Sequence, residues 1–292
     1  MSDLYLSQLW LNPRSRAAWH DLADCQGLHR TLLRAFPDGL LPPSPAAAGE
    51  GQGVGVIPTA YPRGARAACG LLFRPETDRR TGAVRILAQS TVIPDWRALP
   101  PGYVAPAPGC PDGWSTRLLP PTAWQVEAGA RRRFRLRANV TAKVRAPRVP
   151  LAIEGVPNAN GSRVPLRTEG AQLAWLLAHA TAAGFRVTLP APGDAVRDDH
   201  PEAPRLRALA DAEPVAGLPP VRIDRDAPRH GWRPAGEGGG AGHAPRARLT
   251  FEGLTFEGLL EVDDPVRFAG AIRAGIGPAK AYGYGLLSVA PI

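Results

Sequence analysis

A histidine flanked by arginines is the clearest candidate for acid–base chemistry in this sequence. His29 lies between Leu28 and Arg30, and Arg34 follows Arg30 by one helical turn. We expect His29 in the first turn of a helix spanning residues 28–36. There the positive end of the helix dipole and the neighbouring cations favour release of the imidazole proton. The pattern therefore predicts a general acid at His29, suited to protonating a leaving alkoxide.

The other histidines offer one competitor for this role. His20 lies between Trp19 and Asp21, on the short helix expected just before His29. The remaining ones are expected at the surface or satisfied in the core: His179, His200 and His243.

Neither metal nor disulfide chemistry is indicated. No pair of histidines has the spacing of a zinc-binding helix, and Cys25, Cys69 and Cys110 are far apart, without a paired CxxC motif. We therefore expect no metal and no cofactor, and a reducing cytoplasm as the setting. The N-terminal residues lack the pattern of a secretion signal, and no segment reaches membrane-spanning length.

Arginines also line one side of a predicted strand at residues 131–139. Phe134, Leu136 and Ala138 alternate with arginines along it. Such closely spaced like charges repel one another unless an anion neutralises them, and guanidinium groups pair well with phosphate. An exposed sheet surface in an arginine-rich protein is the alternative. We expect RNA-binding positions at Arg131, Arg133, Arg135, Arg137 and also Lys143.

A second basic group lies in the low-complexity segment 191–247, which we expect to be a flexible insertion or hairpin. It comprises Arg222, Arg225, Arg229 and His230. A basic hairpin there would hold an RNA stem through its phosphates and its shape. RNA is favoured over duplex DNA because no helix-turn-helix, zinc-finger or basic-zipper pattern occurs.

The net charge of +9 and the pI of about 10.3 also fit a polyanionic partner. Arginine is abundant throughout the chain, however, in the manner of a GC-rich coding bias. The clusters are therefore more informative than the total charge.

A glycine-rich segment near the C-terminus surrounds Lys280. Its glycines are Gly275, Gly277, Gly283 and Gly285, and an apolar strand follows at 286–289. Glycine permits positive φ and close backbone approach, so such a loop exposes N–H donors to an anion. A dinucleotide-binding fold places its glycines after an early strand instead, which argues against a nucleotide cofactor. A plain turn is the alternative.

The periodicity places these residues on a strand–helix framework. The first half reads as a strand at 4–11, a helix at 15–23, the helix at 28–36, and strands at 71–73 and 84–90. This order is most of a ferredoxin-like βαββαβ unit. Residues 94–121 are rich in Pro and Gly and read as a linker.

The second half repeats this plan. After the strand at 131–139 come a helix at 168–183, strands at 249–251 and 259–262, a helix at 265–274 and the final strand. We therefore expect an α+β protein of two tandem ferredoxin-like domains, residues 1–120 and 121–292.

Short blocks spread along the whole chain resemble CasE, the repeat-processing endoribonuclease family of the type I-E CRISPR Cascade complex. They are residues 11–18, 21–23, 28–32, 94–96, 134–139, 163–166, 174–176, 251–253 or 256–258, and 275–291. The blocks occur in the family's order, and their combination is specific.

This resemblance implies metal-independent cleavage of precursor CRISPR RNA at the base of the repeat hairpin. In the family the ribose 2′-hydroxyl attacks phosphorus, leaving a 2′,3′-cyclic phosphate and a 5′-hydroxyl. The family's catalytic histidine corresponds to His29, and its phosphate-steadying basic residue to Arg34. Many members have a tyrosine where this chain has Gln26. The implied partners are the CRISPR repeat RNA hairpin and the other Cascade subunits, including the backbone protein.

Two alternatives stay open. A non-catalytic RNA-binding subunit of the same superfamily would hold the guide hairpin without cutting it, and Gln26 keeps that possibility alive. An unrelated basic ferredoxin-like structural protein would require the shared blocks to be coincidental.

Overall fold

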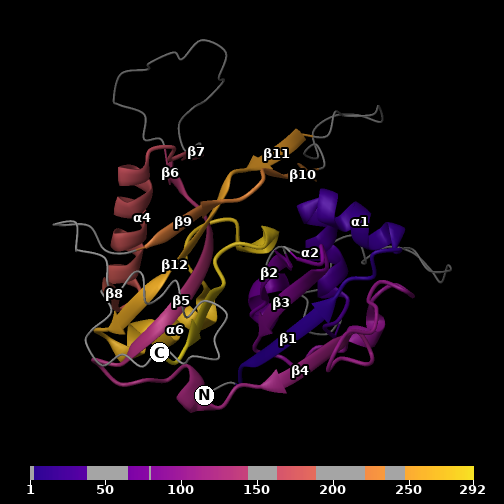
Figure 1. The fold of residues 1–292 in the computed structure, drawn as a ribbon, viewed down its shortest axis with the longest axis horizontal. Helices are drawn as coiled ribbons and strands as arrows, with labels where there is room; N and C mark the ends of the chain where they lie inside the picture. Colours follow the sequence, from indigo (N-terminus) through magenta and orange to yellow (C-terminus); the bar gives the residue numbers. More distant parts are fainter. Residues whose placement is uncertain (1–2, 38–64, 79, 144–162, 189–220, 234–246) are drawn as a thin grey trace, which may run out of the picture.

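The chain folds into two halves, each built on an antiparallel sheet (Figure 1). The structure, a computed structural model, describes residues 3–37, 65–78, 80–143, 163–188, 221–233 and 247–292. None of its described helices is long and apolar enough to cross a membrane.

The first half is centred on β1 (Tyr5–Trp10). Its sheet has the order β2-β3-β1-β4, with β2 at Leu72–Thr77, β3 at Val84–Ser90 and β4 at Trp114–Leu118. Its helices are α1 (Arg16–Ala23), α2 (Cys25–Leu33) and the short α3 (Ala65–Cys69). Leu28 and Leu32 of α2 join Leu9, Phe73 and Ile86 of the sheet in one buried cluster. This is the ferredoxin-like strand order, as expected.

The predicted linker at 94–121 is wrong. These residues contain a 3₁₀ turn, Trp96–Ala98, and the edge strand β4, which pairs with β1. Trp96 is buried and donates from Nε1 to Thr116 Oγ1 at 3.1 Å. The Pro and Gly content had suggested an open connection, but the segment completes the first sheet.

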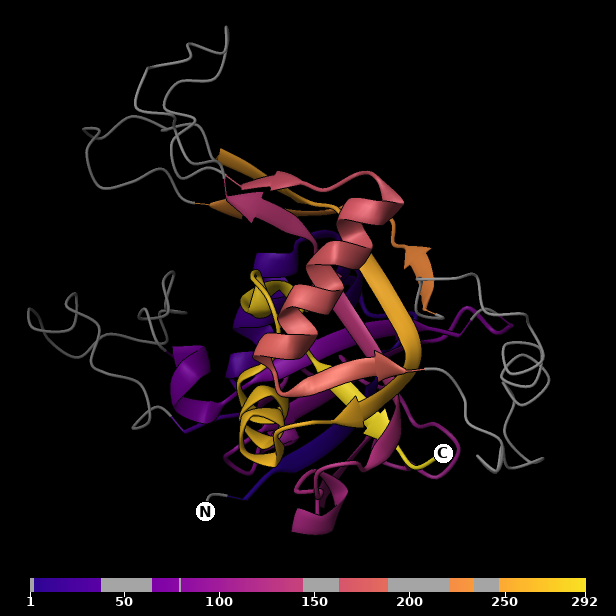
Figure 2. The ribbon, with the colours of Figure 1, turned by 90° about the vertical axis from the view of Figure 1, so that its left-hand side faces the viewer.

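The second half has the full βαββαβ plan. Its sheet has the order β13-β5-β12-β8, and β9 also pairs with β12. The strands are β5 (Arg131–Asn139), β8 (Phe185–Thr188), β9 (Arg222–Arg225), β12 (Gly253–Val262) and β13 (Leu287–Ala290). Figure 2 shows α4 (Glu169–Ala182) and α6 (Pro265–Ala274) lying over one face of this sheet.

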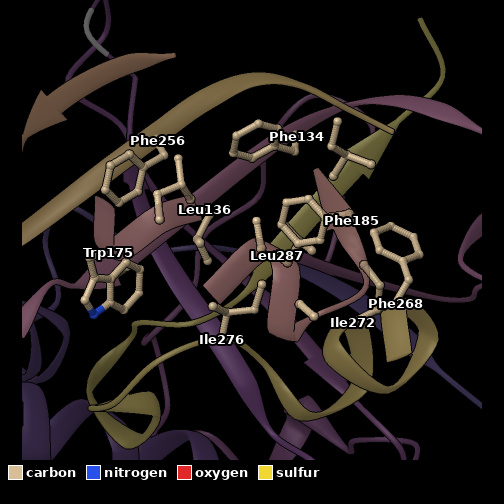
Figure 3. Close-up of a cluster of buried hydrophobic side chains, with 14 of the residues drawn as sticks. Phe134, Leu136, Trp175, Phe185, Phe256, Phe268, Ile272, Ile276 and Leu287 are labelled. Atoms are coloured by element: carbon tan, nitrogen blue, oxygen red, sulfur yellow. The ribbon is translucent and has the colours of Figure 1, made fainter. Parts of the chain in front are cut away.

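The apolar alternation of β5 explains this layer. Phe134 and Leu136 point into the core beneath the helices, together with Phe256 of β12 and Phe268 of α6 (Figure 3). The arginines between them must therefore point to the opposite face, towards the first half, because successive strand residues alternate.

Two short ribbons extend from the second half. β6 (Thr141–Lys143) pairs with β7 (Arg163–Pro165), and β10 (Arg229–Arg233) pairs with β11 (Ala247–Phe251). Within the expected insertion at 191–247, the structure describes β9 and β10. Residues 191–220 and 234–246 of it lie outside the described residues.

The two halves are joined by hydrogen bonds to main-chain carbonyls. Arg74 of β2, which is 4% exposed, donates from Nη1 to the carbonyl oxygens of Arg135 and Leu286, both at 3.4 Å. Gln89 of β3 donates from Nε2 to the carbonyl oxygen of Ile272 at 2.7 Å. Both donors are buried, so these bonds fix the first sheet against the second. The domain division at residue 120 stays a prediction.

Candidate functional site

The helix that carries His29 begins earlier than predicted. α2 starts at Cys25 because Asp24 ends α1 and also caps α2, accepting from the Gln26 N–H at 3.1 Å. His29 is consequently the fifth residue of α2, beyond its first turn. The expectation that the helix dipole acidifies its proton is therefore wrong, because that effect fades within one turn.

Burial dominates the electrostatics of His29 instead. Its ring stacks on Phe73 with centroids 6.2 Å apart, and its Nδ1 is buried without a hydrogen-bond partner among the described residues. Burial and the nearby charge of Arg66 lower the pKa of His29 to about 4. The imidazole is therefore neutral at neutral pH and, without RNA, is ready to accept a proton.

The glycine-rich segment lies against this helix. Its 3₁₀ turn η5 (Lys280–Tyr282) contacts α2 and β2. Burial and the charge of Arg66 lower the pKa of Lys280, so Arg66 lies near both Lys280 and His29. Sequence reasoning missed Arg66 because residues 38–66 read as a surface loop. It also read Phe73 only as part of a strand.

The glycines of this segment adopt the predicted positive φ values. They are 75° at Gly275, 79° at Gly277, 86° at Gly283 and 87° at Gly285. A β-carbon on Gly277 would lie 2.8 Å from the Trp175 ring. The N–H of Gly285 donates to the Arg137 carbonyl, and that of Ile276 to the Gly285 carbonyl. Some of the N–H donors of this loop therefore bind main-chain carbonyls of the protein and are not available to an anion.

The polar side chains near His29 on α2 differ in their exposure to solvent. Gln26 has a buried Oε1 without a partner in the described structure, whereas Arg34 at the helix end is exposed. Arg30 is partly exposed and lies 3.9 Å from Asp24 Oδ2. The competitor His20 is largely exposed on α1 beside Asp21, and His179 stacks on Trp175 in α4.

The arginine face of β5 is neutralised by the protein itself, contrary to the expectation that an external phosphate does so. Arg135 pairs with Glu257 and, at 3.5 Å, with Glu76. Arg137 pairs with Asp226 at 2.6 Å, and Arg131 lies 4.0 Å from Glu261. The sequence could not reveal these pairs because the acidic partners come from other strands and loops.

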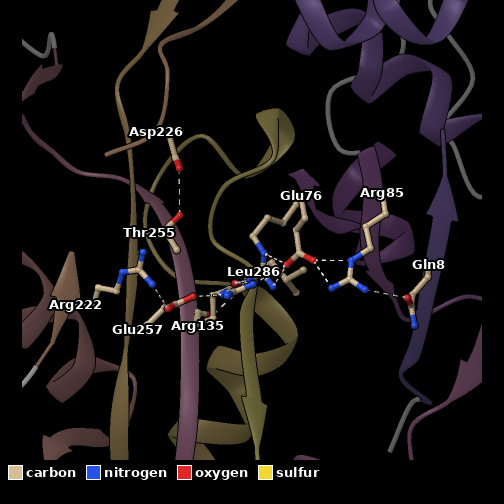
Figure 4. A network of polar contacts seen from close by, with 10 residues as sticks. Gln8, Glu76, Arg85, Arg135, Arg222, Asp226, Thr255, Glu257 and Leu286 are labelled. Atoms are coloured by element: carbon tan, nitrogen blue, oxygen red, sulfur yellow. Dashed lines mark hydrogen bonds and ion pairs between the residues drawn. The ribbon is translucent and has the colours of Figure 1, made fainter. Parts of the chain in front are cut away.

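The two Arg135 pairs belong to a network that crosses both sheets (Figure 4). Glu76 accepts from Arg74 at 2.7 Å and from Arg85 at 2.8 Å, and Arg85 reaches Gln8 at 3.4 Å. Burial raises the pKa of Glu76, but the charges and hydrogen bonds of Arg74 and Arg85 outweigh it and hold that pKa below its usual range. Glu76 is therefore ionised and joins cations of both halves.

The second basic group is also only partly available. Arg222 pairs with Asp224 at 2.7 Å and with Glu257 at 3.5 Å, and the Arg229 guanidinium is buried. Arg225 is exposed and donates to the Arg167 carbonyl at 3.0 Å.

The remaining candidates face solvent to differing degrees. His230 lies on the β10–β11 ribbon, with its Nε2 2.9 Å from Arg248 Nη2. Lys143 is exposed on β6, while Arg133 donates to the Pro291 carbonyl at 3.0 Å.

The structure therefore unites three candidate segments and separates a fourth. α2 contacts both η5 and β10, so His29, Lys280 and the Arg229–His230 pair lie on adjoining elements. Of the β5 arginines, Arg135 pairs across the halves with Glu76, whereas Arg131 and Arg137 pair with carboxylates of the second half. Within the described residues, no group of histidine, cysteine and carboxylate side chains has the arrangement of a metal site.

Comparison with known proteins identifies the family. The family model described as CRISPR associated protein matches residues 4–291. The CRISPR-associated endoribonuclease Cse3 of Thermus thermophilus is 31% identical over 290 residues, 99% of this chain and 100% of the relative. The Cascade subunit CasE of Escherichia coli is 27% identical over 169 residues, 58% of this chain and 62% of the relative.

A solved structure extends this similarity. Thermus thermophilus Cse3 bound to an RNA representing a pre-cleavage complex matches with a TM-score of 0.61 and 28% identity. The match covers 99% of this chain and 100% of that one.

Proposed function

We propose, since the chain belongs to the CRISPR-associated family of Cse3 and CasE endoribonucleases, that it cuts precursor CRISPR RNA at the repeat hairpin. The observation that carries the proposal is the position of His29: a half-buried, neutral imidazole that feels the charge of Arg66, on a helix that contacts the turn of Lys280. The pre-cleavage RNA complex of the Thermus relative supports RNA as the substrate.

The reaction needs no group beyond the RNA and the protein. The ribose 2′-oxygen attacks the adjacent phosphorus while the bond from phosphorus to the 5′-oxygen breaks. The products are a 2′,3′-cyclic phosphate and a 5′-hydroxyl. One proton leaves the 2′-hydroxyl and one joins the departing 5′-oxygen, so the atoms and charges balance.

His29 is suited to the proton transfers. Its pKa of about 4 makes it neutral in the RNA-free protein, so it can accept the 2′-hydroxyl proton. A phosphate anion bound beside it would raise that pKa, because a nearby negative charge favours the imidazolium. The same ring could then protonate the leaving oxygen, as the sequence predicted.

The surrounding cations would stabilise the charge that develops on phosphorus. The charge of Arg66 acts on His29, the turn of Lys280 contacts α2, and Arg34 is exposed at the end of α2. Fixed positive groups aimed at the phosphate oxygens favour the transition state over the ground state. Gln26 takes a positioning role in place of the tyrosine common in relatives, because its amide can donate a hydrogen bond to phosphate.

RNA contacts outside the cleavage site would come from the exposed basic residues. We assign these to Arg30, Arg133, Lys143, Arg225 and His230, with the glycine-rich loop closing on the scissile end. The protein would then retain the processed hairpin and enter a Cascade complex, as the name of the Escherichia coli relative suggests. The three cysteines are buried and form no disulfide in the described structure, which fits the reducing cytoplasm as its location.

The test is cleavage of a repeat RNA in EDTA under single-turnover conditions. His29→Ala should slow cutting about 10²–10⁴-fold while RNA binding stays close to wild type. The matched control is His20→Ala, which changes an exposed ring on the neighbouring helix and should leave the rate unchanged. A 2′-deoxy nucleotide at the cut should also block the wild type. Normal cutting by His29→Ala would transfer the role to another residue.

The second candidate function is RNA binding without cleavage. Gln26 favours it, because glutamine supplies neither a phenolic proton nor an aromatic face. Tight binding of the hairpin by the wild type, with no cutting in EDTA or with added divalent metal, would establish this function instead.

A further inference from the structure

Arg229 on β10 is a buried cation whose hydrogen-bond donors are unused. Both terminal nitrogens, Nη1 and Nη2, are buried without a hydrogen-bond partner among the described residues. A guanidinium in such a position is strongly unfavourable unless an anion or another acceptor compensates it. Arg229 is not needed for the proton transfers assigned to His29, so its burial requires a separate explanation.

Two close backbone approaches fix where this guanidinium lies. A β-carbon on Gly231, two residues along β10, would lie 2.9 Å from Cys25 Sγ at the start of α2. A β-carbon on Gly283 would lie 3.3 Å from Arg229 Nη1. The head of Arg229 therefore lies between the glycine-rich loop and the N-terminal turn of α2.

The groups around it add positive charge and donors. Burial and the charge of Arg137 lower the pKa of Arg229. The nearby carboxylate of Asp226 is already engaged, by Arg137 Nε at 2.6 Å and by Thr255 at 3.3 Å. Burial raises the pKa of the Cys25 thiol to about 11, so it supplies no negative charge.

Tyr284 offers a further polar group. Its hydroxyl is buried without a partner in the described part of the chain, and the Arg137 guanidinium lies 5.1 Å from its ring centre. Burial raises the pKa of Tyr284 to about 12, so the hydroxyl stays protonated and can donate. Arg229, Arg137 and Tyr284 thus form a cluster rich in donors and short of acceptors.

The cluster has a route to solvent. Arg229 and Arg137 both line a cleft of about 700 Å³ between the two halves, together with Arg225, Asp226 and Pro228.

We propose that Arg229, with Arg137 and the Tyr284 hydroxyl, forms a binding subsite for one phosphate oxyanion, separate from the cleavage site at His29. A tetrahedral phosphate presents several acceptors at once, and a guanidinium fork binds two of them. The anion would neutralise the surplus charge and use the donors that the protein leaves free. The subsite does not depend on the cleavage chemistry.

The test compares the thermal unfolding of wild-type protein, Arg229→Met and Arg117→Met during titration with inorganic phosphate. Wild type should gain roughly 5 °C or more at a phosphate concentration 100 times its Kd. Arg229→Met should lose that gain. Without phosphate it should be at least as stable as wild type, because an apolar chain of similar length replaces an uncompensated charge. Arg117→Met, which alters an exposed arginine of β4 that does not line this cleft, should keep the gain.

A second titration distinguishes the two sources of phosphate. If a single-stranded repeat fragment without the hairpin protects wild type but not Arg229→Met, and inorganic phosphate protects neither, the ligand is a backbone phosphodiester. Equal gains in wild type and Arg229→Met with both ligands would overturn the proposal. So would a loss of stability in Arg229→Met with wild-type stability in Arg229→Gln, which would show that Arg229 donates hydrogen bonds to the protein itself.

Discussion

Two basic regions of the molecule differ in whether their charged groups are paired within the protein. On the β5 face, Arg131, Arg135 and Arg137 each lie beside a carboxylate of the same chain. At the junction of α2, β10 and the glycine-rich loop, His29 and Arg229 keep buried nitrogens without partners in the described structure. The paired arginines stabilise the fold, and Arg135 also joins the two halves through Glu76, whereas unpaired donors are available to a ligand. The number of cations in a segment therefore says less about phosphate binding than their pairing does.

The largest expected effect tests the paired region. Glu76→Gln leaves Arg74 buried with a weakened partner and also loosens Arg85 and Arg135. We expect a loss of about 3–5 kcal/mol in the free energy of unfolding, measured by denaturant titration. Glu252→Gln, which breaks the exposed pair with Arg167, should cost less than about 1 kcal/mol. Equal costs would mean that the network between the halves contributes little.

The next effect tests the glycine-rich loop. Gly277→Ala places a β-carbon 2.8 Å from the Trp175 ring at φ of 79°. We expect a destabilisation of about 2–3 kcal/mol in chemical unfolding, from the backbone strain and the clash together. Gly129→Ala has nearly the same φ, 81°, but open space around the new β-carbon, so it isolates the backbone cost. If both variants lose the same stability, close packing against Trp175 is not what requires glycine at 277.

A pH series sharpens the assignment of the unpaired region. The pKa of His29 falls from 6.5 to about 4 on folding, so the unfolded chain binds more protons between these values. Stability should therefore decrease as the pH falls from 6.5 towards 4. His29→Gln should make this part of the curve of thermal midpoint against pH shallower. An unchanged slope in the variant would place His29 in a more hydrated environment than the structure has.

The smallest expected effect distinguishes β5 arginines that bind RNA from those that stabilise the fold. Arg133→Glu should lower the salt dependence of RNA binding by about one unit in the slope of log K against log salt, with little change in stability. Arg135→Glu instead sets a new carboxylate beside Glu76 and Glu257, so its main effect should be on unfolding. An RNA titration at several salt concentrations, with unfolding curves for both proteins, measures the two contributions.

Much of the framework could be predicted from residue patterns. The alternation of Phe134 and Leu136 identified β5 and its buried face, and Thr168 with Gly184 bounded α4. The family resemblance was confirmed by the match over residues 4–291. Each of these signals is local or depends on a repeating period, which is why sequence alone carries it.

The features that could not be predicted from the sequence depend on contacts between distant segments. The Pro and Gly content before residue 121 gave no indication of β4, because that strand forms only by pairing with β1. α2 begins at Cys25 because one aspartate ends a helix and caps the next. Arg66 gave no signal, since its effect on His29 comes from proximity in space. The roles of the individual site residues stay predictions.

The bonds from Arg74 and Gln89 to carbonyl oxygens have an evolutionary consequence. Every residue carries such an oxygen, so substitutions at positions 135, 272 and 286 leave these three acceptors in place. Homologous proteins can therefore differ in the side chains at these three positions of the second half, while the hydrogen bonds donated by the first half are retained.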